Sequence, residues 1–206
     1  MQGISNVSKA VSTKTTHPIL SCIFIEAENG NIKLTANDME IGIESYVEGT
    51  VIEEGKVAIE AKLLSDIVRK LPDSEIHMET NEDFKTTIKC EKSLFTIAGK
   101  SGEDFSSLPV VEKSKFITIS QFTLREIINQ TIFSISDSEY NNVMTGELFE
   151  VSNNRLRVVA IDGHRIAIRN VELKNESEDV KVIVPGKALS YISKIVSGGV
   201  DDDVII

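Results

Sequence analysis

Tryptophan is absent from this 206-residue chain, and aromatic residues make up only 5% of it. Cysteine occurs twice, at Cys22 and Cys90, each inside an apolar run and neither in a cluster with metal-ligand spacing. We interpret both as buried thiols, because free cysteine packs as a small hydrophobe. No stretch approaches the roughly 18 uninterrupted apolar residues that a membrane helix needs, and the first residues lack the layout of a secretion signal. We therefore expect no membrane partner and a cytoplasmic location.

Positive charge is also scarce, since 22 lysines and arginines face 32 acidic residues and leave a net charge of −10. Nucleic-acid binding usually shows as a basic footprint, so the sum argues against it. The positive charges, however, are concentrated in particular segments of the chain. Segment 61–71 holds three cations and only Asp66 as an acid, and segment 185–199 holds Lys187 and Lys194 with no acid. On charge alone, ordinary solvated helix faces are the preferred explanation of this pattern.

The chain contains an internal repeat. KVAIEAKLLSDIVRKLP at 56–72 aligns without gaps with KVIVPGKALSYISKIVS at 181–197, at an offset of 125 residues. Further upstream the offset is 124, and we place the one-residue change between Asp38 and Ile41, as an extra residue in the Gly163-His164-Arg165 turn of the second copy. A fixed period of this kind identifies a repeated structural unit. The identical pairs are Lys56/Lys181, Val57/Val182, Lys62/Lys187, Leu64/Leu189, Ser65/Ser190 and Ile67/Ile192.

Each copy is predicted to open with an amphipathic helix, because Ile4, Val7 and Val11 recur at helical spacing, as do apolar residues over 124–132. A second helix is predicted over 61–71, with apolar residues on one face and charges on the other. Strand-like runs surround these helices. The fold class is therefore α+β with antiparallel sheets, in two domains of residues 1–114 and 115–206. The strand-like runs lie at 18–27, 31–36, 40–47, 75–80, 86–91 and 93–99.

The two copies do not match at their ends. The run KFITIS at 115–120 precedes the second copy's first helix, but its counterpart would lie before Met1, while Ile206 corresponds to about Asn81. We expect the chain to be a fragment, with its first domain lacking a strand and its second domain incomplete at the C-terminus. The alternative is a divergent small protein with natural ends, but it would leave sheet edges unpaired.

Seven motifs in order resemble the beta subunit of bacterial DNA polymerase III, the DNA sliding clamp, over the whole chain. The resemblance implies a DNA-clamp fold of three domains per chain, the third absent here, with sheets outside and helices lining a pore. It also implies a homodimeric ring that encircles duplex DNA without reading its sequence, tethers the replicative DNA polymerase, and has no catalytic activity, cofactor or metal. The motifs are KAVSTKTTHPIL, IFIEAENGNIKLTANDMEIGIES, AKLLSDIVRKLP, EDFSSLP, TGELFEV, LRVVAIDGHRIAIR and VIVPGKALS.

Three cations are candidates for phosphate contact. The resemblance implies this role for Lys14 and Arg69, and the repeat adds Lys194. Weak, salt-screened attraction to phosphates would position a duplex without reading its bases. For Arg69, a helix-surface arginine that covers apolar residues with its stem remains an open alternative.

The resemblance also implies an apolar pocket for short linear motifs of polymerases, the clamp loader and repair proteins. Its residues here would be Met144, Gly163, His164, Arg165 and Ile166. Glycine permits close backbone approach, arginine pairs with acidic groups, and methionine offers an adaptable apolar wall. A plain tight turn with a structural histidine is the alternative. Because the remaining wall belongs to the third domain, we expect this chain to bind such peptides weakly or not at all.

The ring interface is assigned by the same resemblance to Phe95 and Ile97, for which burial in the core is the alternative. Without the third domain, we expect the chain itself to form no stable ring, which light scattering and retention on circular DNA would test.

Two other functions compete with a clamp. One is a hydrolase using Asp162 and His164 as an acid–base pair or metal ligands, although the chain has no HExxH, GxSxG or P-loop motif. The other is a stand-alone interaction module that shares only the clamp fold. A metal titration and a hydrolase screen would test the first, and the reading frame beyond Ile206 would test the second.

Overall fold

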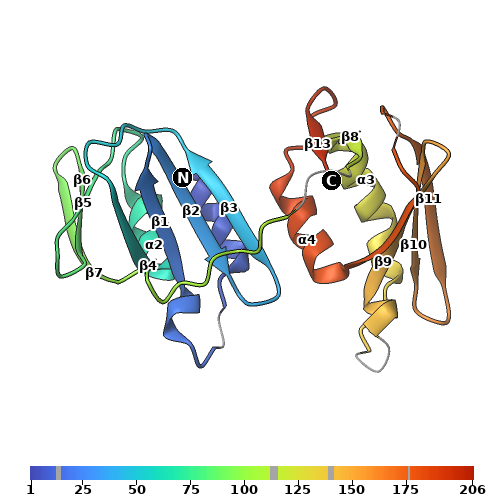
Figure 1. Cartoon of the computed structure of the whole chain (residues 1–206), viewed down its shortest axis with the longest axis horizontal. Helices are drawn as coiled ribbons and strands as arrows, with labels where there is room; N and C mark the ends of the chain where they lie inside the picture. The colour runs from blue at the N-terminus through green and yellow to red at the C-terminus, as the bar shows by residue number, and fades with distance from the viewer. Residues whose placement is uncertain (13–14, 112–115, 139–141, 176) are drawn as a thin grey trace. The chain divides into compact units, whose positions relative to one another are not determined.

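The computed structural model describes residues 1–12, 15–111, 116–138, 142–175 and 177–206. The chain divides into two compact units, Met1–Pro109 and Val110–Ile206 (Figure 1). The boundary predicted between residues 114 and 115 lies outside the described residues, as does Lys14. No helix of the described residues is long and apolar enough to cross a membrane.

Unit 1 is a seven-stranded antiparallel sheet with two helices, ordered β3-β2-β1-β4-β7-β6-β5. The first helix is shorter than predicted, because α1 ends at Val7 and a 3-10 turn follows, so that Val11 is extended and outside the helix. Another 3-10 turn, Pro18–Ser21, replaces the start of the strand predicted from residue 18. The elements are α1 (Gln2–Val7), β1 (Cys22–Glu28), β2 (Asn31–Asn37), β3 (Gly42–Val47), β4 (Gly55–Glu60), α2 (Ala61–Lys70), β5 (His77–Thr80), β6 (Lys85–Cys90) and β7 (Ser93–Lys100).

The core of unit 1 lies between one face of the sheet and the helices. Alternate residues of β1 point to this core, and Ile23 is fully buried there with Leu64 of α2 and Ile88 of β6. The intervening residues of β1 point to the other face of the sheet, where Cys22 and Phe24 belong to a separate cluster. Cys22 and Cys90 are both buried free thiols, which confirms their interpretation from the sequence.

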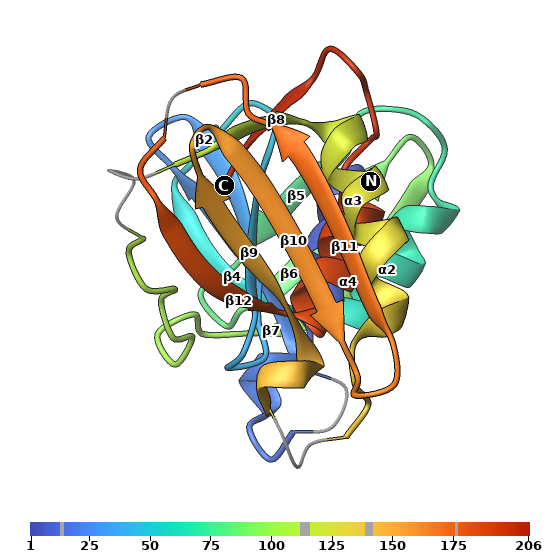
Figure 2. The same ribbon diagram turned by 90° about the vertical axis from the view of Figure 1, so that its right-hand side faces the viewer.

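Unit 2 has a four-stranded sheet ordered β11-β10-β9-β12, whose strands lie side by side in Figure 2, and a separate two-stranded sheet of β13 and β8. Phe149 and Val158 on the sheet pack with Ile127, Ile128 and Leu189 of the helices. Ser120 caps the first helix by accepting a hydrogen bond from Thr123 N. The elements are β8 (Thr118–Ser120), α3 (Gln121–Thr131), β9 (Gly146–Ser152), β10 (Arg155–Ile161), β11 (Ile166–Glu172), β12 (Val180–Pro185), α4 (Gly186–Ile195) and β13 (Asp203–Ile205).

The two units confirm the repeat: β3-β2-β1-β4 followed by α2 corresponds to β11-β10-β9-β12 followed by α4. The predicted position of the one-residue change is wrong, however. Asp38 N donates to Ile41 O at 3.1 Å, and Asp162 N donates to Arg165 O at 3.3 Å, so the two turns have the same length. The offset of 124 therefore continues through the turn. Gly42 pairs with Asn37 just before the first turn, and Ile166 pairs with Ile161 just before the second, so Gly42 corresponds to Ile166. The extra residue falls later, before β4 and β12.

Candidate DNA-facing and partner-binding surfaces

Helix α2 is amphipathic, as the sequence predicts. Leu64, Ile67 and Val68 are buried, while Arg69 and Lys70 form a basic last turn, where cations favour the negative end of the helix dipole. The Arg69 guanidinium is two-thirds exposed and donates to the carboxylate of Asp66, one turn earlier on the same helix. Such exposed pairs contribute little stability. The structure thus places Arg69 on the surface, in an exposed ion pair.

Helix α4 is the counterpart of α2 in unit 2. Leu189 is buried, and Lys194 is exposed in the last turn, at the position that corresponds to Arg69. The two predicted cations are therefore equivalent by structure as well as by sequence, each at the C-terminal end of its unit's second long helix. Lys187 has interactions of its own, and the structure does not describe Lys14.

The turn between β10 and β11 is fixed by Asp162. Its Oδ1 accepts hydrogen bonds from His164 N at 3.0 Å and Arg165 N at 3.1 Å, and its Oδ2 accepts from Arg165 Nε at 2.6 Å. Gly163 has φ +89°, a conformation that L side chains rarely adopt. The hydrogen bonds from His164 N and from Arg165 hold the pKa of the Asp162 carboxyl below its usual range. This carboxylate is engaged as a structural acceptor, which leaves it poorly suited to acid–base chemistry.

Two residues predicted for the pocket, Arg165 and Met144, lie near the segment that follows α3, which was not predicted as part of the site. The Arg165 guanidinium lies 6.0 Å from the ring centroid of Phe133, an exposed aromatic in the 3-10 turn that follows α3. Ser136 N, just after this turn, donates to Met144 O at 2.8 Å. Phe133 was missed because it lies off the apolar face of the helix. Phe133 is 58% exposed, Ile166 is exposed as well, and Met144 is half-buried.

The two residues predicted for the ring interface differ in burial. Both lie on β7 and, two residues apart, share one face of the sheet. Ile97 is 8% exposed and belongs to the core of unit 1, whereas Phe95 is 37% exposed. Phe95 pairs with Ile88, which pairs in turn with the partly exposed Met78. Of the two side chains, only that of Phe95 is exposed enough to contact another chain.

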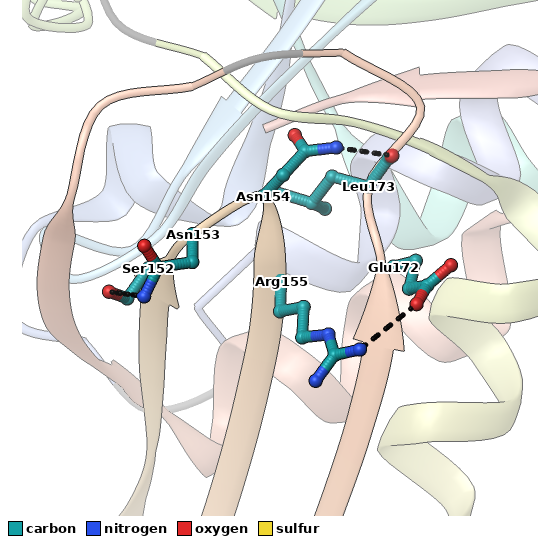
Figure 3. A pocket seen from close by; sticks show the side chains of 6 residues that line it. All are labelled: Ser152, Asn153, Asn154, Arg155, Glu172 and Leu173. Carbon is teal, nitrogen blue, oxygen red and sulfur yellow. Dashed lines mark hydrogen bonds and ion pairs between the residues drawn. The ribbon is translucent and has the colours of Figure 1, made fainter.

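A polar hollow of about 480 Å³ lies at the opposite end of the β10–β11 hairpin from the Asp162 turn (Figure 3). Its side chains are engaged with one another: Arg155 pairs with Glu172 at 3.2 Å, and Asn154 Nδ2 donates to Leu173 O at 3.2 Å. Nothing in its lining matches a predicted site residue. Among the residues that the structure describes, no group of three or more histidine, cysteine or acidic side chains could hold a metal ion.

Solved structures of similar fold define the class of this protein. A DNA polymerase III beta subunit from Eubacterium rectale superposes with a TM-score of 0.96 and 56% sequence identity, over 100% of this chain and 56% of that chain. The DNA polymerase sliding clamp of Bacillus subtilis gives a TM-score of 0.91 and 32% identity, over 99% of this chain and 55% of that chain. The fold is that of the DNA sliding clamps.

Sequence comparisons give the family. Residues 1–109 match the N-terminal domain of the DNA polymerase III beta subunit, and residues 118–206 match its central domain. The chain belongs to the DNA polymerase III beta subunit family. The beta sliding clamp of Halalkalibacterium halodurans is 37% identical over 95% of this chain and 54% of the relative, and that of Staphylococcus epidermidis is 39% identical over 98% and 56%. The chain thus spans about half the length of the curated relatives it matches.

Proposed function

We propose that these two units are part of a DNA polymerase processivity factor, a ring-shaped clamp that encircles duplex DNA and tethers the replicative polymerase. The observation that supports this most strongly is the structural equivalence of Arg69 and Lys194. Two repeated units of the beta subunit family each carry a cation in the last turn of the same helix. In a clamp of this kind, such helices face the duplex.

A ring holds DNA by enclosing it, so it needs no base contacts, and base contacts would hinder sliding. Exposed cations such as Arg69 and Lys194 supply attraction to phosphates that is independent of sequence and screened by salt. The excess of acidic residues over the rest of the chain disfavours DNA binding elsewhere.

Partners bind, in this proposal, at the surface of unit 2 around the Asp162 turn. Phe133, Met144 and Ile166 offer apolar contact, and Arg165 offers a cation for an acidic group. Gly163 lets a peptide backbone approach closely. The partners would be short linear motifs of the polymerase, the clamp loader and repair proteins.

The role is proposed to be non-catalytic and to need no cofactor, because Asp162 is engaged by Arg165 and by two backbone amides instead of being poised for proton transfer. Acting on DNA, the protein would work in the cytoplasm at the nucleoid. A homodimeric ring would use the β7 surface, with Phe95 contacting the neighbouring chain and Ile97 supporting it from the core.

The double variant Arg69→Ala/Lys194→Ala tests the DNA-facing helices. Affinity for random-sequence duplex DNA, measured by fluorescence anisotropy over a salt series, is expected to fall. The slope of log K against log salt should decrease by up to about 1.8, since each lost phosphate contact removes about 0.9.

The matched control is Lys89→Ala/Lys92→Ala, which removes the same net charge from two exposed lysines on and beside β6. This control should leave the slope within error of the parent's. Equal losses in both double variants would show that net charge alone governs binding, and would contradict the proposed interface.

A further inference from the structure

Helix α2 carries a single acidic residue, Asp66, on the same face as its cations. Lys62 lies four residues before Asp66, and Arg69 and Lys70 lie three and four residues after it. Residues three and four apart are neighbours on a helix surface, so the carboxylate lies in the middle of the basic face. The Asp66 side chain is 43% exposed and that of Arg69 is 68% exposed. The face that carries the proposed phosphate contact thus also carries a group that competes with phosphate.

The Asp66 carboxylate already occupies Arg69. The guanidinium donates a hydrogen bond to Asp66 Oδ1, with the acid on the N-terminal side of the base, which is the favourable order for an ion pair on a helix. An exposed pair of this kind is weak and screened by salt. A phosphate can therefore displace the carboxylate. Each contact between Arg69 and DNA first breaks the ion pair with Asp66, however, so Arg69 attracts DNA less than a free arginine would.

Helix α4, the counterpart of α2 in unit 2, contains no acidic residue. At the offset of 125 residues, Tyr191 stands in place of Asp66, and Ile195 stands in place of Lys70. Three cations and one acid give α2 a net charge of +2, and two lysines with no acid give α4 the same net charge. Asp66 therefore offsets the one cation that α2 has in excess of α4.

We propose that Asp66 is a positioning residue that limits how strongly unit 1 holds duplex DNA, because its carboxylate competes with phosphates for Arg69. The inference rests on the proposed function and describes how the attraction of α2 for the duplex is regulated. Phosphate contacts must position the duplex without fixing it, since strong contacts at one helix would slow movement along the DNA. With Asp66 in place, two helices of equal net charge attract the duplex to a similar degree.

The variant Asp66→Asn tests this inference, because it removes the charge and keeps the size of the side chain. Binding of random-sequence duplex DNA to the whole chain is followed by fluorescence anisotropy over a salt series. Affinity is expected to rise about two- to fivefold, which is the range that an exposed ion pair supplies. The slope of log K against log salt should become steeper by up to about 0.9, since Arg69 then makes a full phosphate contact.

The matched control is Asp104→Asn, which makes the same change of charge at an exposed residue in the segment that follows β7. It should raise affinity less than Asp66→Asn does and leave the slope within error of the parent's. A second control repeats both substitutions in an Arg69→Ala background. There the effect of Asp66→Asn should fall to that of Asp104→Asn, because the ion pair that it breaks is already absent.

Two results would overturn the proposal. One is a change of affinity and slope in Asp66→Asn that is no larger than that in Asp104→Asn, which would show that net charge alone governs binding. The other is an excess effect of Asp66→Asn that persists in the Arg69→Ala background, which would show that the carboxylate does not act through Arg69. Either result, together with a reduced slope in Arg69→Ala/Lys194→Ala, would leave the proposed function standing. An unchanged slope in that double variant would instead contradict the DNA-facing role of the two helices.

Discussion

Unit 1 and unit 2 share the order of four strands and the helix that follows them, but they differ in other strands and in the residues at corresponding positions. Their four main strands have the same order, and in each turn the carboxylate of Asp38 or Asp162 accepts a hydrogen bond from the backbone N–H three residues later. In unit 1, Phe24 is buried on the face away from the helices, where its ring stacks on Phe105 of the segment that follows β7. The turns differ as well: Met39 and Glu40 stand where unit 2 has Gly163 and His164. The repeat thus keeps the strand order and the length of this turn, while the residues at the turn differ between the two units.

Removing the ring of Phe105 should have the largest effect, which is a loss of stability in unit 1. Phe105→Ala is expected to destabilise unit 1 by about 4 kcal/mol, because it deletes a buried aromatic side chain and its stacking on Phe24. Differential scanning calorimetry would follow the unfolding of each unit. The control Phe122→Ala removes a ring that is 47% exposed in unit 2 and should cost under about 1 kcal/mol. Equal losses would mean that the segment after β7, which carries Phe105, does not support unit 1.

The core position of Ile23 is occupied in unit 2 by Glu147, whose side chain is fully buried. Burial raises the pKa of the Glu147 carboxyl from 4.5 to about 7, opposed by the hydrogen bond from Thr131. Between these values the unfolded chain loses the proton while the folded chain keeps it. The stability of unit 2 should therefore be fully present below pH 4.5, fall by about 3 kcal/mol as the pH rises to 7, and then level.

Urea unfolding at a series of pH values, compared with Glu147→Gln, isolates this carboxyl from other titrating groups. The difference in unfolding free energy between the two proteins should change with pH over this window. A constant difference would show that Glu147 is ionised in the folded protein. The hydroxyl of Thr131 has one proton for two acceptors, Ile127 O at 2.8 Å and Glu147 Oε2 at 2.9 Å, so its hydrogen bond offsets only part of the effect of burial on Glu147.

Substitutions at the corresponding positions of the two turns, Gly163 and Met39, should have smaller effects on stability. Gly163 and Met39 both have positive φ, at +89° and +77°. Gly163→Ala should cost unit 2 about 1 kcal/mol, because a side chain is strained in this conformation, and Met39→Gly should be neutral or stabilise unit 1 by under about 1 kcal/mol. Thermal unfolding of both variants checks this. A stabilising Gly163→Ala or a destabilising Met39→Gly would contradict the equivalence of the turns.

The smallest effect is expected at Arg69. Its pairing with Asp66 is exposed, so Arg69→Ala should change the stability of unit 1 by less than about 0.5 kcal/mol. The same substitution is proposed to weaken DNA binding, so a variant that loses DNA affinity at unchanged melting temperature separates function from folding. A loss of several degrees would instead assign Arg69 a structural role.

Sequence reasoning predicted the features that local pattern and repetition encode. The amphipathic face of α2, the burial of both cysteines and the equivalence of Arg69 with Lys194 follow from spacing alone. The Asp162 turn was located, but its length relative to the Asp38 turn was wrong. Sequence alignment places an insertion by matching residue types, whereas the register is fixed by backbone hydrogen bonds.

Other features depend on contacts between segments that are distant in sequence. The packing of Leu108 on Gly42 and the approach of Phe133 to Arg165 leave no periodic signal. The burial of Glu147 contradicts the usual exposure of acidic residues, and only its alignment with Ile23 could have indicated it.

The most direct test of the clamp assignment joins residues 1–206 to the C-terminal part of the Eubacterium rectale relative, which this chain matches over 56% of its length. Retention of the chimera on nicked circular DNA is measured at high salt after loading by that organism's clamp loader, before and after the DNA is linearised. The account predicts retention on the circle and rapid loss once a free end is present. Equal retention on both forms, or release from both by salt, would show binding by charge alone and contradict a ring that encloses the duplex.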